Sequence, residues 1–143
     1  MTTIIAVDPG NMTGLAVGRF TSTGPPQHES LELEPMKALD WVSDRLREGA
    51  SLAAYETFKP RKGVYTWQPE ALYVIGAVRY LCYLSDTPCI GQEPADAKRF
   101  STNRKLEVLG WRNPSEGGHR DDASRHLLVA AVNGNLIDPE VFL

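Results

Sequence analysis

The sequence predicts an α/β domain with a five-stranded mixed sheet, in which three antiparallel strands are followed by two parallel strands and helices flank the sheet. Two observations lead to this prediction. Residues 3–33 contain three short apolar runs separated by turn residues, as in an antiparallel meander. Residues 35–92 then alternate between helical and strand patterns, and a strand reached through a helix usually lies parallel to its neighbour.

The first half of the chain supplies four strands and one helix. The apolar run Ile4–Val7 predicts a strand over 3–8, and the turn PGNM joins it to a second strand at 13–20. The polar stretch TSTGPPQH precedes a third strand at 29–33. Pro35 begins an amphipathic helix that Gly49 ends, and SLAAYETF follows as the fourth strand, over 51–58.

The second half alternates helices with one more strand. Residues 69–84 predict a largely buried helix, and PCIGQ, residues 88–92, predicts the fifth strand. Pro94 begins a short helix, PADAKRF, and RKLEVLG forms another. The last helix runs from His119 to about Val132, after a Gly-Gly pair that lets the chain turn.

Composition and charge limit the classes of function. The 143 residues suit one domain, 1–143, with an ordinary globular composition. A net charge of −3 argues against indiscriminate binding to polyanions, yet residues 57–125 hold eleven basic and eight acidic side chains. Two cysteines and a start without a basic, apolar leader predict a cytoplasmic protein, and ALYVIGAVRYLCYL is too short to span a bilayer.

Two acidic residues stand at the ends of apolar strands. Asp8 ends the first strand, and Glu56 lies near the end of the fourth. If these strands are parallel neighbours, both carboxylates meet at one edge of the sheet, where two unpaired anions would repel each other. A cation between them would remove that repulsion, and oxygen ligands of this kind suit Mg²⁺ or Mn²⁺.

The start of the last helix adds a third contribution. His119 and Asp122 are three residues apart and so share one helix face, which Ala123 and His126 continue. Asp121 falls on a different face, so we prefer Asp122 as the ligand. The start of a helix also favours anions electrostatically.

Each of these residues has a purely structural alternative. An Asp before Pro-Gly is a common turn former, and Glu56 could be a surface charge at a strand end. His119 and Asp122 could cap the helix, and His126 fits a packed or exposed histidine better than a metal ligand. The combination of two strand-end acids with an acid and a histidine on one helix face favours a metal site.

In this arrangement the sequence resembles the RuvC family of Holliday junction resolvases, within the ribonuclease H-like superfamily, and particularly its short phage versions. Four segments carry the resemblance, in the family's order along the chain: IIAVDPGNMTGLAV, AAYETF, EPADAKRF and HRDDASRHLL. Together they cover roughly residues 3–132. One departure is that a histidine, His119, stands where the family usually has a fourth acid.

The resemblance implies a metal-dependent endonuclease that acts in DNA recombination by cutting four-way junctions symmetrically. It implies Asp8, Glu56, His119 and Asp122 as the catalytic and metal-binding set, with two Mg²⁺ ions, for which Mn²⁺ could substitute. In this hypothesis Asp8 bridges both ions, Glu56 and Asp122 hold one each, and His119 either ligates a metal or helps to deprotonate the water. If the protein is phage-encoded, its location is the host cytoplasm.

A DNA surface is predicted in two segments. The loop FKPRKGVYTW after Glu56 mixes cations with aromatics, a combination suited to unpaired strands, and a second basic run follows the fifth strand. In the resembled family an aromatic inserts at the junction centre, a role open here to Phe58, Tyr65 or Trp67. The predicted DNA contacts are Phe58, Lys59, Arg61, Lys62, Lys98, Arg99, Arg104 and Lys105.

A four-way junction has approximate two-fold symmetry, so a homodimer with two active sites is the natural assembly. The helix at 69–84 has apolar residues on more than one side, which suits either a dimer interface or complete burial within one subunit.

Three other functions are alternatives to a junction resolvase. They are a flap, fork or RNA/DNA-hybrid nuclease with the same acids, a sugar-kinase-like ATPase, and an inactive junction-binding module. The ATPase needs a second lobe for which 143 residues leave no room, and an inactive module would not need all four site residues.

Overall fold

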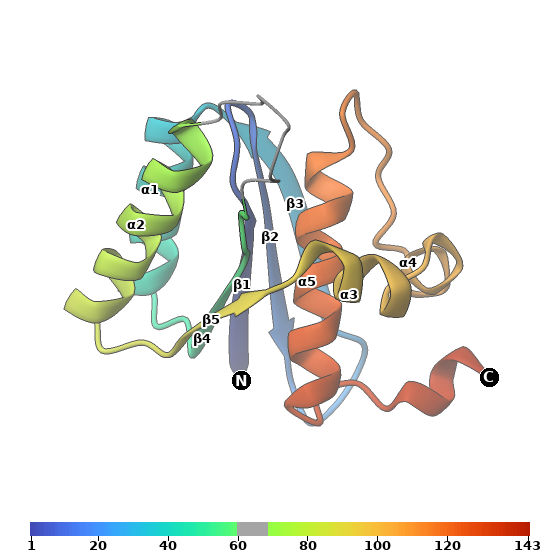
Figure 1. Cartoon of the computed structure of the whole chain (residues 1–143). Coiled ribbons are helices and arrows are strands. Elements are labelled where there is room, and N and C mark those ends of the chain that lie inside the picture. Colours follow the sequence, from blue (N-terminus) through green and yellow to red (C-terminus); the bar gives the residue numbers. More distant parts are fainter. Residues whose placement is uncertain (60–68) are drawn as a thin grey trace.

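The computed structural model describes residues 1–59 and 69–143 (Figure 1). Its sheet has the strand order β3-β2-β1-β4-β5. The pairs β1–β2 and β2–β3 are antiparallel, whereas β1–β4 and β4–β5 are parallel, which confirms the predicted mixed sheet. The strands are β1 (Thr2–Asp8), β2 (Thr13–Phe20), β3 (Gln27–Leu33), β4 (Leu52–Glu56) and β5 (Cys89–Gln92).

Helices cover both faces of the sheet, so that the molecule has three layers (Figure 1). One face carries α1 (Pro35–Arg47) and α2 (Pro69–Leu84). The other carries α5 (His119–Asn133), with α3 (Pro94–Phe100) and α4 (Asn103–Leu109) beside it and the short 3-10 helix η1 (Pro139–Phe142) at the end of the chain.

The alternation of side chains along β1 divides the core into two clusters. Ile5 and Val7 point toward α1 and α2, whereas Ile4 and Ala6 point toward α5. Small residues on α5, such as Ala123 and Ala130, bring that helix close to the sheet. Asp8 is the next residue of β1 on the same side as Ile4 and Ala6, so its carboxylate also points toward α5.

Some predicted boundaries and burial patterns differ from the structure. The fourth strand ends at Glu56 rather than residue 58, and the third begins at Gln27. The expectation that helix 69–84 is largely buried was wrong: α2 buries one stripe against the sheet layer and leaves the opposite stripe exposed. Its mixed pattern therefore reflects one buried and one exposed apolar face. Among the described helices, none is long and apolar enough to cross a membrane.

Candidate active site

Strand register brings the two predicted acids together. Val7 of β1 pairs with Tyr55 of the parallel strand β4, so the residues that follow, Asp8 and Glu56, end their strands at the same level. Both belong to the series of side chains that faces α5. The predicted meeting of the two carboxylates at the carboxyl edge of the sheet is therefore confirmed.

The first turn of α5 is fixed from outside the helix. Gly117 and Gly118 have φ of 79° and 70°, in the left-handed region, so the predicted turning role of this pair is confirmed. Glycine offers no side chain to cap a helix, and Glu32 of β3 does so instead: its Oε1 accepts from the backbone N–H of Arg120 at 3.1 Å and from the Ser115 hydroxyl. Sequence reasoning missed this capping contact across the fold.

One pocket of about 270 Å³ contains the four predicted site residues. Asp8, Glu56, His119 and Asp122 line it, together with the turn after β1 and the aromatic side chain of Phe58. Nδ1 of His119 lies 3.1 Å from Oδ2 of Asp8. The strand ends and the start of α5 thus place three carboxylates and one imidazole around the same space.

Burial and hydrogen bonding in this pocket shift the pKa values of its groups. Burial raises the pKa of Asp8 to about 8; the hydrogen bond with His119 opposes this shift, and the contact with Glu56 adds to it. The pKa of His119 is raised, mainly by its hydrogen bond with Asp8. Burial alone would raise the pKa of Glu56, but hydrogen bonds from His126 and Asp8 outweigh it and hold that pKa below its ordinary value.

A buried histidine lies behind Glu56. Nε2 of His126 is 3.1 Å from Oε1 of Glu56, and its Nδ1 is 2.8 Å from Oε1 of Gln92. His126 is completely buried, so it is a packed histidine, the structural alternative that the sequence favoured over a metal ligand. Its hydrogen bond to Glu56 was missed, although its place on the face of His119 and Asp122 was a signal for it.

The two adjacent aspartates have different surroundings. Asp122 lines the pocket with Asp8, and its Oδ1 accepts from Nε of Arg125 at 3.3 Å. Asp121 is buried on an adjacent face of the helix, outside the acid pocket, where its Oδ1 accepts from the backbone N–H of Asn113 at 2.8 Å and so ties down the preceding loop. The predicted difference in helix face between the two residues holds.

The donor set fits a divalent cation, although the side chains are now hydrogen-bonded to one another. In residues 1–59 and 69–143, no three carboxylate, imidazole or thiolate groups are already arranged around one ion position. Even so, a buried carboxylate with a pKa of about 8 that faces a second carboxylate is a pair that a positive charge would stabilise. Oxygen-rich donors of this kind suit Mg²⁺ or Mn²⁺.

A larger cavity of about 740 Å³ adjoins this pocket through Asp122, which lines both. Four cations line it, two of them predicted from the sequence and two not: Lys98, Arg104, Arg112 and Arg125. Asp121 and Asp122 are the acidic residues of this lining, so the cavity carries an excess of positive charge. It is the part of the described surface next to the acids that best suits an anionic chain.

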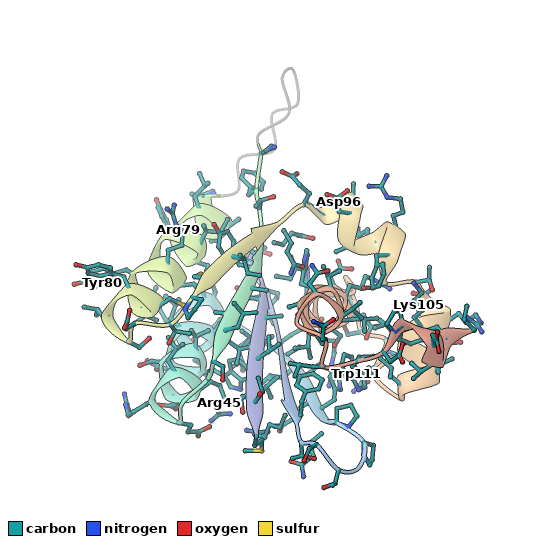
Figure 2. All side chains as sticks on the ribbon, turned by 90° about the horizontal axis from the view of Figure 1, so that it is seen from below. Arg45, Arg79, Tyr80, Asp96, Lys105 and Trp111 are labelled. Carbon is teal, nitrogen blue, oxygen red and sulfur yellow. The ribbon has the colours of Figure 1, made fainter. Side chains whose placement is uncertain are left out.

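The remaining predicted DNA contacts lie in several places. Phe58 lines the acid pocket, and Lys59 is exposed in an ion pair with Glu93 at 2.8 Å. Arg99 pairs with Asp96 on exposed α3, and Nζ of Lys105 lies 3.9 Å above the ring of Phe100, so this ammonium is partly engaged within the fold (Figure 2). The predicted contacts Arg61 and Lys62, and the aromatics Tyr65 and Trp67, lie outside the described residues.

Solved structures share this architecture. RuvC of Thermus thermophilus superposes with a TM-score of 0.63 at 15% identity, covering 94% of this chain and 98% of that one. The fold is therefore that of RuvC. The same T. thermophilus protein in complex with a Holliday junction substrate gives a TM-score of 0.67 at 16% identity, with 94% and 96% of the two chains covered.

A viral structure is also similar to this chain. The fowlpox virus Holliday junction resolvase superposes with a TM-score of 0.51 at 16% identity, covering 93% of this chain and 99% of that one. No protein-family profile and no curated protein sequence matches this chain. The RuvC fold of the chain is thus established by its three-dimensional structure.

Proposed function

We propose that this protein is a metal-dependent endodeoxyribonuclease that resolves four-way DNA junctions by symmetric phosphodiester hydrolysis. One observation carries the proposal: Asp8, Glu56, His119 and Asp122 line a single pocket at the carboxyl edge of a RuvC-type sheet. The similar structures are those of RuvC and of a viral Holliday junction resolvase, and RuvC is also solved in complex with a Holliday junction substrate, which supports a branched-DNA substrate.

In this proposal Asp8, Glu56 and Asp122 hold two Mg²⁺ ions, for which Mn²⁺ can substitute. The bound ions supply Lewis acidity that activates a water and stabilises the leaving oxygen of the cleaved strand. His119, hydrogen-bonded to Asp8 at the pocket wall, either joins the ligands or accepts a proton from the water. Arg125 donates from Nε to Oδ1 of Asp122, and its other guanidinium nitrogens donate to the Ser101 carbonyl and to Oδ1 of Asn103, so this side chain holds the Asp122 carboxylate at the pocket wall.

The cationic cavity beside the acids gives the DNA strand a path away from the site. Lys98 and Arg104 line this cavity, and Asp122 lines both it and the acid pocket. The charge of Lys98 adds to the hydrogen bonds from His126 and Asp8 that lower the pKa of Glu56 against the opposing effect of burial, so this ammonium lies within electrostatic range of the acids. A backbone cleaved at the acids would therefore continue over basic residues, which contact phosphates without reading sequence.

A homodimer completes the proposal. Two cuts related by two-fold symmetry need two sites, and the outer stripe of α2 presents exposed apolar residues on which two copies can pack (Figure 2). Leu72, Tyr73, Tyr80, Tyr83 and Leu84 form this outer stripe. Tyr80 and Tyr83 stack on each other with ring centroids 6.5 Å apart.

A substrate comparison tests the function. Labelled four-way junction, flap, replication fork, linear duplex and RNA/DNA hybrid are incubated with the protein and Mg²⁺ or Mn²⁺. Paired symmetric nicks in the junction alone are expected, and Asp8→Asn should abolish them while junction binding persists. Preferential cutting of a flap, fork or hybrid would replace the named substrate by the alternative, a structure-selective nuclease of the same fold.

The adjacent aspartates provide a matched pair for the same assay. Asp122→Asn removes a carboxylate from the acid pocket, so cleavage should fall at least a hundredfold. Asp121→Asn retains an oxygen that can accept from the Asn113 N–H, and cleavage should stay within a few-fold of the natural protein. The reverse result would assign the ligand to Asp121.

A further inference from the structure

His126 connects the acid pocket to the core through two hydrogen-bond partners on neighbouring strand ends. Glu56 of β4 and Gln92 of β5 are direct partners in the parallel register, and the imidazole of His126 on α5 lies against both. The histidine is fully buried, and both of its ring nitrogens are engaged. Its orientation is therefore fixed by the fold.

The chemistry of these groups sets the direction of each hydrogen bond. An ionised carboxylate only accepts, so Nε2 of His126 donates to Glu56. In a neutral imidazole Nδ1 then accepts, which requires a donor from Gln92.

Gln92 can provide this donor. As placed, its Oε1 faces Nδ1, and its Nε2 is buried without a hydrogen-bond partner in the described part of the chain. Exchanging the amide O and N leaves the shape unchanged, gives Nδ1 a donor and pairs the buried Nε2. The hydrogen bonds then run in one direction, from Gln92 to His126 to Glu56.

We propose that His126 is a positioning residue that holds the Glu56 carboxylate ready for the metal ion through Nε2–H, and that Gln92 fixes the tautomer in which Nε2 is the donor. This inference rests on the proposed metal-dependent function. A carboxylate held in place loses less freedom on binding an ion, and such outer partners typically change metal affinity by about 10- to 100-fold.

Two amide substitutions separate the two nitrogens of the ring. His126→Gln places an amide nitrogen near the position of Nε2 and can still donate to Glu56, whereas His126→Asn reaches only the region of Nδ1. Both variants bury one neutral amide, so their folding is comparable and can be monitored by circular dichroism. His28→Asn is the control, since His28 bonds to Ser124 and stacks on Trp111.

The measurement is the affinity for Mn²⁺ alone, without DNA, by electron paramagnetic resonance of the free ion. We expect His126→Gln and His28→Asn to bind within about threefold of the natural protein, and His126→Asn to bind at least tenfold more weakly. Equal Mn²⁺ affinities of the two His126 variants, whether both strong or both weak, would overturn this proposal. The proposed metal site around Asp8 would stand as long as the natural protein binds Mn²⁺. No Mn²⁺ binding by the natural protein would contradict both this inference and the proposed function.

A second readout requires neither metal nor a variant of the histidine. The ¹⁵N spectrum of the imidazoles should show His126 as the Nε2–H tautomer, with a proton slow to exchange that shifts in Glu56→Gln and stays in place in Asp121→Asn. A His126 protonated at Nδ1 alone would overturn the proposal, even if the Mn²⁺ affinities followed the expected order.

Discussion

Gly14 of β2 lies against the backbone carbonyl of His119, so that a Cβ at this glycine would be only 2.0 Å from that oxygen. Gly14 is also the cross-strand partner of Asp8 in the antiparallel pair of β1 and β2. The residue opposite the catalytic candidate thus lacks a side chain at the point where the last helix begins. This absence lets α5 approach closely enough for His119 to contact Asp8.

Gly14→Ala should therefore move the start of α5 and destabilise the fold. The added methyl meets backbone rather than a flexible side chain, so we expect a loss of about 1 to 3 kcal/mol in urea unfolding. Gly76→Ala on α2 is the control, since a Cβ there meets open space in the described structure and alanine favours a helix by up to about 1 kcal/mol. If Gly14→Ala matches the natural protein in stability, the close approach between Gly14 and the start of α5 is contradicted.

The Glu32 cap gives a second prediction. Burial alone would raise the pKa of Glu32, but hydrogen bonds from Ser115 and the Arg120 backbone keep it below its ordinary value. Its stabilising effect is thus complete above pH 4.5 and disappears as the pH falls through the lower, folded-state pKa. Glu32→Ala should cost about 1 kcal/mol at pH 7, typical of a lost helix cap, and less in acid.

Exposed Glu29 on the same strand provides the control for that cap. Glu29→Ala should leave both the stability and its pH dependence unchanged within error in chemical denaturation. Cleavage of DNA should fall in Glu32→Ala alone, because the cap positions the turn that carries His119. If Glu32→Ala and Glu29→Ala have equal effects, Glu32 acts only through its negative charge and not as a helix cap.

Asp8 gives a prediction that links pH to metal binding. Because burial raises its folded pKa to about 8 from a usual 3.8, the folded state binds one more proton between these values, and stability without metal decreases as the pH rises from about 4 to 8. Asp8→Asn removes this charge and should stabilise the protein in EDTA at pH 8.5 by about 2 to 4 kcal/mol, with little effect at pH 4.

Metal should reverse the order of stability of the natural protein and Asp8→Asn at this pH. Adding millimolar Mn²⁺ at pH 8.5 is expected to raise the melting temperature of the natural protein and leave Asp8→Asn nearly unchanged, since the ion neutralises the carboxylates it binds. Chelation should restore the starting values. If the natural protein and Asp8→Asn respond equally to Mn²⁺, the pocket around Asp8 is not the metal site.

Sheet topology and the meeting of Asp8 and Glu56 could be predicted, because apolar strand patterns are local signals and a strand reached through a helix usually lies parallel to its neighbour. The difference between Asp121 and Asp122 likewise followed from helix periodicity. Specific side-chain hydrogen bonds between distant segments could not be predicted in this way. The Glu32 cap on α5 joins residues 88 positions apart, and no spacing rule indicates it. The His126 contact with Glu56 spans 70 positions: helix periodicity places His126 on the face of His119 and Asp122, but it does not indicate the partner of the imidazole.

The burial of α2 could not be predicted from the sequence either, because the buried and the exposed stripes of this helix are both apolar. Ala71, Val74, Val78 and Cys82 face the core, while Tyr80 and Tyr83 on the opposite side are mostly exposed. A surface of this kind suits a second copy of the chain in the proposed homodimer. It leads to the last prediction.

Tyr80→Arg combined with Tyr83→Arg should convert a dimer into a monomer of 15.8 kDa, since two guanidinium groups per copy cannot be buried against their own symmetry mates without partners. Sedimentation at micromolar concentration measures the change, and Val108→Arg on exposed α4 is the control. Each monomer keeps its acid pocket, so the junction should still be nicked, but one strand at a time. A natural protein that sediments as a monomer, or a double variant that remains dimeric, would rule out α2 as the interface.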